Sequence, residues 1–221
     1  MGSLLRWIDD FYSEPDLVRE IALRSEYFVP EGFYGPRSTK GFLPRGTIEK
    51  IQESFGFTKV RLIATAQRST HFYHCLVHGK HRSRFFAHID GARDARHPLY
   101  SMVVYLTLRP PKDSGSGIFR HRKTGLWQEP TSEDAHRLGQ STTELEAMLD
   151  ADAGRRSRWE LLESSEHVYN RAVLFPAHWY HSSCRDFGSR LETGRLYQAF
   201  FFYGYPEPGQ DQARTPDLQS S

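Results

Sequence analysis

The stretch Asn170-Arg-Ala-Val-Leu-Phe-Pro-Ala-His-Trp-Tyr-His181 combines a short apolar run with a proline and two histidines. The run Ala172–Phe175 has the length and residue types of a buried strand, and the following proline marks its end. His181 follows Phe175 by six residues, so an imidazole lies shortly beyond the strand. His178 is a competing candidate three residues before it. We therefore expect a β-rich core with a functional group near the end of this strand.

Further short runs with the residue types of strands follow along the chain from residue 59. They are rich in β-branched and aromatic residues and are bounded by Gly, Pro, Asp or Ser, which is typical of strands. The predicted strands are Val60–Thr65, Thr70–Val77, Ser83–Ile89, Tyr100–Leu108, Gly117–His121, Trp159–Glu163, Arg171–Phe175 and Arg195–Tyr203.

Helical patterns flank and interrupt these strands. Ser13 is positioned to cap a helix with Pro15 in its first turn, and a second helix is predicted from Thr47 to Phe55, ended by Gly56. Residues 126–158 are polar and helix-like, with Thr142 as a candidate cap. The expected class is mainly β with flanking helices. We expect one domain over residues 1–205, with a helical flank at 1–58, a β core at 59–205 interrupted by the insert at 126–158, and a flexible tail at 206–221.

The composition excludes several classes of function. The 221 residues carry 29 Lys+Arg and 27 Asp+Glu, and a net charge of +2 is too small to indicate nucleic acid or a membrane as the main partner. The longest apolar runs, such as Met102–Leu106, are too short to cross a bilayer, and Met1–Trp7 lacks the apolar region of a secretory signal. Two cysteines fit a reducing compartment, so a cytoplasmic location is expected.

Four residues, His88, Asp90, His181 and Arg195, are candidates for binding a metal ion or an anion. In a strand His88 and Asp90 point to the same side, and with His181 they would form the set of two histidines and one carboxylate that binds non-heme Fe(II) and leaves positions open. Arg195 opens the last apolar strand, where a buried guanidinium requires an anion. The competing interpretation makes Arg195 a solvated edge residue.

The remaining histidines offer weaker alternatives. His71, His74, His78 and His81 are spaced 3, 4 and 3 residues apart and would share one face of a helix as a zinc site, but the residues around them favour a strand and a turn. His97 and His121 are expected to be solvated or in loops.

The order of these motifs resembles the Fe(II)/2-oxoglutarate-dependent oxygenases, in particular the prolyl-hydroxylase-like branch. The motifs that carry the resemblance are His88-Ile-Asp90, Tyr100-Ser-Met-Val-Val-Tyr-Leu-Thr107, Ser114-Gly-Ser-Gly-Ile-Phe119, Phe175 to His181, and Arg195, within residues 8–205. The resemblance implies a double-stranded β-helix, or jelly-roll, core.

The resemblance also implies roles for individual residues. His88, Asp90 and His181 would bind Fe(II), and Arg195, with the Tyr105 hydroxyl, would bind the distal carboxylate of 2-oxoglutarate. The interval from His181 to Arg195 is longer than usual in the family, so Arg190 is an alternative. Asp90 occupies the position that halogenases leave empty, which speaks against halogenation.

The implied activity is oxidation, by default hydroxylation, of an unactivated C–H bond with O2, releasing succinate and CO2. A small molecule is the expected substrate, with Arg120 and Trp179 as candidate contacts and the 126–158 insert as a candidate lid. The alternatives are a peptidyl prolyl-type hydroxylase, a cupin-type metal-dependent isomerase or lyase, and a non-enzymatic jelly-roll binding module. A nucleic-acid dealkylase would need a second Arg where Phe201 stands.

Overall fold

The computed structural model describes residues 3–30, 35–63, 69–77, 84–94 and 96–206. The strands are β1 (Arg6–Ile8), β2 (Tyr27–Phe28), β3 (Arg37–Ser38), β4 (Phe57–Leu62), β5 (Phe72–Cys75), β6 (Leu99–Tyr105), β7 (Ser116–His121), β8 (Trp159–Ser164), β9 (Ala172–Pro176), β10 (His181–Ser183) and β11 (Arg195–Pro206). The helices are α1 (Pro15–Arg24), α2 (Thr47–Phe55), α3 (Ser132–Leu138), α4 (Thr142–Asp152) and the 3-10 helix η1 (Arg156–Arg158).

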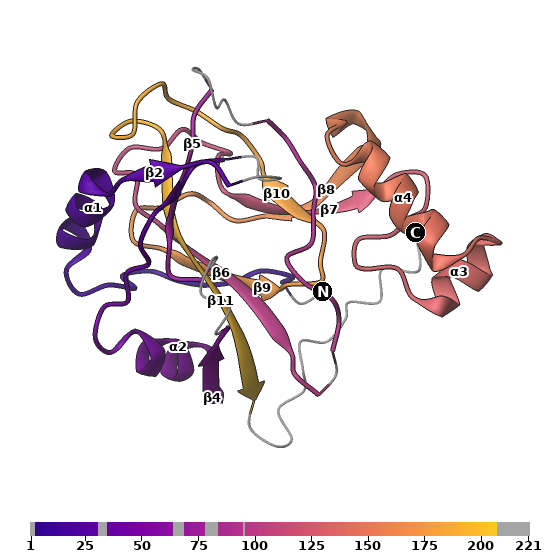
Figure 1. The fold of residues 1–221 in the computed structure, drawn as a ribbon, viewed down its shortest axis with the longest axis horizontal. Coiled ribbons are helices and arrows are strands. Elements are labelled where there is room, and N and C mark those ends of the chain that lie inside the picture. Colours follow the sequence, from indigo (N-terminus) through magenta and orange to yellow (C-terminus); the bar gives the residue numbers. More distant parts are fainter. Residues whose placement is uncertain (1–2, 31–34, 64–68, 78–83, 95, 207–221) are drawn as a thin grey trace.

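Two antiparallel sheets form the body of the molecule (Figure 1). The larger follows the order β1-β9-β6-β11-β5-β3-β2, with β4 also paired to β11, and the smaller follows β10-β7-β8. Because β11 is 12 residues long, it pairs with β5 near its start and with β4 near its end, while β6 runs along its other edge. The mainly β class with flanking helices is confirmed.

Strand β9 shows why the run Ala172–Phe175 is apolar throughout. Ala172 and Leu174 belong to the core between the larger sheet and helices α1 and α2, whereas Val173 and Phe175 belong to the core that joins the two sheets. Successive side chains in a strand point to opposite faces, so a strand with both faces covered must be apolar at every position. The same alternation divides β6 between the two cores.

The helical insert packs on the outer side of the smaller sheet, to the right in Figure 1. Leu145 and Leu149 of α4 join Phe119 of β7 and Trp159 of β8 in a third core. Both helices of the insert begin with a capping box, Thr131 with Asp134 and Ser141 with Glu144. No helix in the described ranges is long and apolar enough to cross a membrane.

Several local predictions need correction. Helix α1 begins after Glu14 with no side-chain cap, so Ser13 is not its cap, and the cap of α4 is Ser141 rather than Thr142. Helix α2 does end at Gly56, whose φ of +69° is left-handed. The predicted strand Ser83–Ile89 is not a strand in its described part: the chain is without regular structure there, and only His88 forms an isolated bridge.

Other predicted elements were missed or cannot be compared. The sequence analysis missed the strands β1, β2, β3 and β10, which are two or three residues long, whereas α3 lies inside the predicted helical insert at 126–158. The predicted flexible tail lies, except for Pro206, outside the described residues.

Candidate metal centre and pocket

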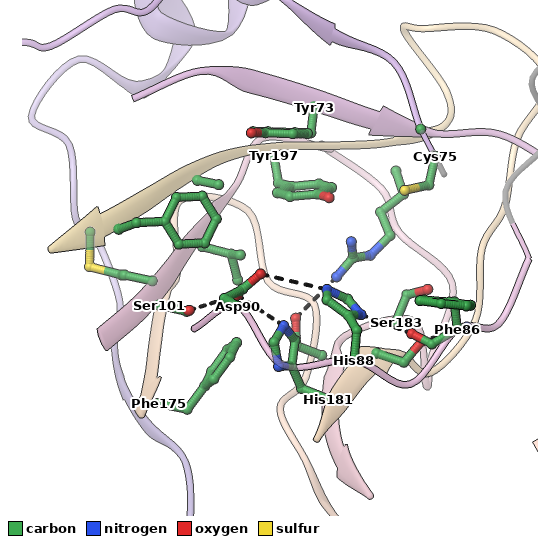
Figure 2. Close-up of a pocket in the computed structure, with 18 of the residues that line it drawn as sticks. Tyr73, Cys75, Phe86, His88, Asp90, Ser101, Phe175, His181, Ser183 and Tyr197 are labelled. Carbon is green, nitrogen blue, oxygen red and sulfur yellow. Dashed lines mark hydrogen bonds and ion pairs between the residues drawn. The ribbon is translucent and has the colours of Figure 1, made fainter. Parts of the chain in front are cut away.

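His88, Asp90 and His181 come together although they lie far apart in the sequence. His88 and Asp90 lie on the segment that follows β5, and His181 opens β10. The backbones of His88 and His181 exchange two hydrogen bonds, with N–H to O distances of 3.1 and 2.9 Å. His181 Nε2 lies 3.1 Å from Asp90 Oδ2 and His88 Nε2 lies 3.7 Å from Asp90 Oδ1. Figure 2 shows the three side chains pointing toward one another.

The orientation of both imidazoles is set by backbone carbonyls. His88 Nδ1 lies 2.9 Å from the Phe86 carbonyl oxygen, and His181 Nδ1 lies 2.9 Å from that of Trp179. A carbonyl oxygen can only accept, so each Nδ1 must carry the proton. Nε2 is therefore the nitrogen that faces the centre in both rings, and it is the atom that a metal would bind in place of a proton, as in metal-ligating histidines generally.

Asp90 is ionised at this position. Burial is the largest influence on its pKa and would raise it, but the neighbouring His181 and His88 and the hydrogen bonds from His181 and Ser101 together outweigh burial and hold the pKa well below its usual value. Ser101 on β6 donates its hydroxyl to Asp90 Oδ2 at 2.6 Å. The carboxylate is thus available as an anionic ligand and is held in place by a second residue.

This donor set fits a metal ion. One ligand atom from each of the three residues lies within 4.8 Å of the other two, and in the described part of the chain they are the only such group of three or more His, Cys, Asp or Glu side chains. Two imidazole nitrogens and one carboxylate oxygen suit Fe(II) with positions left open. His178 is not in the group; burial, and then Arg93, lower its pKa to about 4.

The alternative zinc cluster, which the sequence did not favour, finds no support within the described ranges. His71 and His74 lie at β5, where His71 Nδ1 is 2.7 Å from the Ser38 carbonyl oxygen. His78 and His81 lie outside the described residues. His97 is exposed beside Asp94, as expected, but His121 is buried, with Nε2 at 3.2 Å from Asp152, so its predicted solvated position is wrong.

The centre lies in a pocket of about 290 Å³ between the two sheets. Met102, Val103, Phe175 and Phe201 give it apolar walls. The charged side chains among its described lining residues are Asp90, Arg84 and Arg195, and Asp90 is the only acid. The pocket is therefore apolar on its sides and positively charged away from the three ligands.

Arg195 lines this pocket from the first position of β11 and is only 3% exposed. Its Nε donates to the Ser114 carbonyl at 3.3 Å and its Nη2 donates to Ser116 Oγ at 3.1 Å, while its guanidinium lies 4.6 Å from the centroid of the Tyr197 ring. Within the described ranges no carboxylate forms a salt bridge with it. Arg195 is thus a buried cation whose partners are neutral, and the solvated-edge interpretation is wrong.

The competing residue Arg190 is exposed in the turn before β11 and does not line the pocket.

Tyr105 is not placed as expected. It is fully buried and does not line the pocket; its hydroxyl lies 3.0 Å from Ser116 Oγ and 2.8 Å from Ser165 Oγ, and it accepts the Ser116 N–H. Its ring stacks on His167, with the centroids 4.0 Å apart. Tyr105 therefore supports the surroundings of Arg195, and the tyrosines that do face the pocket are Tyr73 and Tyr197.

The two predicted substrate contacts and the predicted lid do not line this pocket. Arg120 pairs with Glu160 of β8 at 2.9 Å and does not line the pocket. Trp179 packs edge-to-face on Trp127, 4.8 Å between centroids, and contributes only its carbonyl to the orientation of His181. No residue of the 126–158 insert lines the pocket, because the insert covers the outer side of the smaller sheet.

The sequence analysis missed Ser101 and Arg84. Arg84, Phe86, His88 and Asp90 all line the pocket, whereas Phe85 and Ala87 join the core under the insert. This period of two was visible in the sequence and could have marked Arg84 as facing the same way as His88. The signal was obscured because the segment forms no regular strand.

Comparisons with known proteins are consistent with this geometry. Residues 2–202 match the family described as "Family of unknown function (DUF6445)". No curated protein matches the sequence.

Among solved structures, HygX from Streptomyces hygroscopicus with nickel and 2-oxoglutarate bound aligns with a TM-score of 0.50 at 15% identity, covering 99% of this chain and 91% of HygX. A Pseudomonas putida prolyl-4-hydroxylase aligns with a TM-score of 0.41 at 13% identity, covering 93% and 94% of the two chains. The likeness to HygX confirms the jelly-roll fold.

Proposed function

We propose that this chain, which belongs to the DUF6445 family of unknown function, is an Fe(II)- and 2-oxoglutarate-dependent oxygenase that oxidises an unactivated C–H bond of a small molecule. One observation carries the proposal: the His88–Asp90–His181 centre and the buried cation Arg195 line the same pocket. HygX, which shares the fold, was crystallised with nickel and 2-oxoglutarate.

His88, Asp90 and His181 would hold the iron through Nε2, a carboxylate oxygen and Nε2. Iron bound there would supply the activation of O2, driven by oxidative decarboxylation of 2-oxoglutarate to succinate and CO2. The protein's part is to hold the ligands before the metal arrives, which the Phe86 and Trp179 carbonyls and Ser101 do. Phe175 packs 4.5 Å from the His181 ring and keeps water from that side.

Arg195 would bind the distal carboxylate of 2-oxoglutarate. A buried guanidinium without a carboxylate partner is costly, and a ligand that supplies one removes much of that cost. Its Nε donates to the Ser114 carbonyl and its Nη2 to Ser116 Oγ, so the guanidinium group is held in one orientation. This cation is what favours an oxygenase over a cupin-type isomerase or lyase, or a binding module, since those would use the three ligands without a dicarboxylate.

A small-molecule substrate fits the size of the pocket. Its volume of about 290 Å³ lies at the lower end of ligand pockets, roughly 300–1,000 Å³, and must hold both 2-oxoglutarate and the reacting part of the substrate. We further propose that residues 1–205 act as one domain, supported by Asn170, whose side chain accepts the Tyr12 N–H at 2.8 Å and donates to the Tyr12 carbonyl at 2.9 Å. The sequence contains two cysteines, a number that fits a reducing compartment and supports a cytoplasmic location.

Anaerobic titration with Fe(II) and then 2-oxoglutarate tests the proposal. Chelation of iron by 2-oxoglutarate gives a visible charge-transfer band, which we expect in the wild type and not in His88→Ala. His97→Ala is the matched control, because the His97 side chain is about as exposed as that of His88 and lies beside an aspartate, but outside the pocket. If the wild type gives no band, or if His88→Ala keeps it, the proposed function is wrong.

A further inference from the structure

We infer that the substrate is an organic anion and that Arg84 binds its anionic group at the wall of the pocket. This inference rests on the proposed function and adds the chemical class of the substrate. It concerns a residue outside the metal centre and outside the surroundings of Arg195.

Arg84, Phe86, His88 and Asp90 all line the pocket, together with Ile89, whereas Phe85 and Ala87 pack in the core under the insert. Phe86 and His88 lie between Arg84 and Asp90 on the same side, with ring centroids 6.0 Å apart. On the opposite side Phe85 packs edge-to-face on Phe119 at 5.1 Å, which keeps the segment from rotating. Arg84 therefore shares the face of the metal ligands because of the backbone, and its exposed side chain is directed at the same space.

Arg84 is available for a ligand. Within the described ranges it forms no salt bridge or hydrogen bond through its side chain. Arg120, a candidate substrate contact from the sequence, is by contrast paired with Glu160. Asp90, the only acid among the described lining residues, is already committed to His181, His88 and Ser101.

The charges of the loaded pocket leave one cation unmatched. Two positive charges of Fe(II) and one of Arg195 would be balanced by Asp90 and the two carboxylates of 2-oxoglutarate. The charge of Arg84 then remains, in a pocket whose apolar walls strengthen its field. A neutral substrate would leave this charge unpaired, and a cationic one would be repelled.

The spacing sets the shape of the substrate. Four residues of extended chain span at most about 14 Å, so the Cα atoms of Arg84 and His88 are no farther apart than that. The anionic group would then lie on the order of 10 Å from the metal, several bonds from the C–H that reacts. Phe86 lies between the two positions and would contact the middle of the molecule.

The test measures, by ligand-observed NMR, the binding of small-molecule probes to the full chain loaded with zinc and 2-oxoglutarate. Zinc replaces iron so that the complex cannot turn over. The probes are carboxylic acids, each paired with its primary amide, and phosphate monoesters, each paired with its alcohol. We expect anionic members to bind and their neutral partners to bind at least 10-fold more weakly. Loss of one charge-assisted contact predicts that Arg84→Gln weakens binding of the anionic probes roughly 10- to 100-fold. Arg190→Gln is the control, because Arg190 is exposed and lies outside the pocket.

The outcomes separate this inference from the proposed function. Preference for acids or for phosphates identifies the anion. Equal binding of neutral partners, equal binding by Arg84→Gln, or no binding by any anionic probe overturns the inference. Loss of the iron–2-oxoglutarate band in Arg84→Gln would also overturn it, since Arg84 would then be binding the cosubstrate. Absence of the band in the wild type would instead refute the proposed function.

Discussion

Replacing Arg195 with methionine should separate stability from cosubstrate binding. Arg195 is buried, and its described partners are a carbonyl, a hydroxyl and two aromatic rings. Desolvation of a charge without an anion costs several kcal/mol, while the ring contacts return up to about 2 kcal/mol. Methionine has similar length and no charge to desolvate. We expect Arg195→Met to change the free energy of unfolding of the ligand-free protein by no more than about 1 kcal/mol, or to raise it.

The effect on 2-oxoglutarate is expected to be large. A charge-assisted, buried pair with a carboxylate is worth about 3 kcal/mol or more, so affinity should fall at least roughly 100-fold. At a concentration 100 times the wild-type Kd, 2-oxoglutarate should stabilise the zinc-loaded wild type by about 2.7 kcal/mol and the variant by only about 0.4 kcal/mol.

Urea denaturation of both proteins, with and without 2-oxoglutarate, measures both quantities in one experiment. Arg190→Met is the control, because Arg190 was the other candidate from the sequence and lies outside the pocket. The reasoning is refuted if Arg195→Met keeps the full ligand-induced stabilisation, or if Arg190→Met loses it.

Three further predictions concern the residues around the centre. Asp90→Ala should abolish succinate formation and iron retention while circular dichroism still shows a folded protein; turnover in this variant would remove Asp90 from the ligand set. Ser101→Ala removes the 2.6 Å hydrogen bond to Asp90 and should weaken iron binding roughly 10-fold in a chelator competition, as loss of an outer-shell partner does; Ser183→Ala is a pocket control without that bond, and unchanged affinity in Ser101→Ala would show that Asp90 is held without it. For His167, burial and then Arg195 lower the pKa to about 3; the unfolded chain therefore takes up the proton first, and stability should fall as the pH drops from about 6.5 toward 3. In His167→Phe the midpoint of urea unfolding should depend less on pH between pH 6.5 and 5 than in the wild type. An unchanged pH dependence would contradict the stated cause.

The sequence predicted the parts of the fold that depend on local pattern. The apolar run at β9, the end of α2 at Gly56 and the start of β11 at Arg195 each follow from residue type and spacing. The very short strands could not be predicted, because two or three residues carry no periodicity and pair only through tertiary contacts. The helix α3 lies within the predicted helical insert, but its separate start was not predicted, although Thr131 and Asp134 form a capping box there.

The candidate site also has a part that local sequence pattern predicts and a part that depends on tertiary contacts. The two-residue spacing of His88 and Asp90 predicted that both side chains point to one side. Whether a side chain on the correct face also reaches the pocket depends on its position along the strand. Tyr105 fails this test because Ser116 and Ser165 already occupy its hydroxyl. Arg120 fails because Glu160 lies beside it on the paired strand. These partners come from other strands and have no signature in the local sequence.

The paired backbone hydrogen bonds between His88 and His181 have a consequence for how the centre assembles. The separation of the two imidazoles is set by peptide groups at 2.9 and 3.1 Å, as in any rung of a ladder, and not by the ion. The main chain therefore already holds the two imidazoles at their spacing before a metal binds, so capture of iron needs little rearrangement of the main chain. Side-chain changes nearby should spare this spacing, whereas deleting a single residue between Pro176 and Tyr180 would turn the second imidazole to the opposite face and dismantle the centre at once.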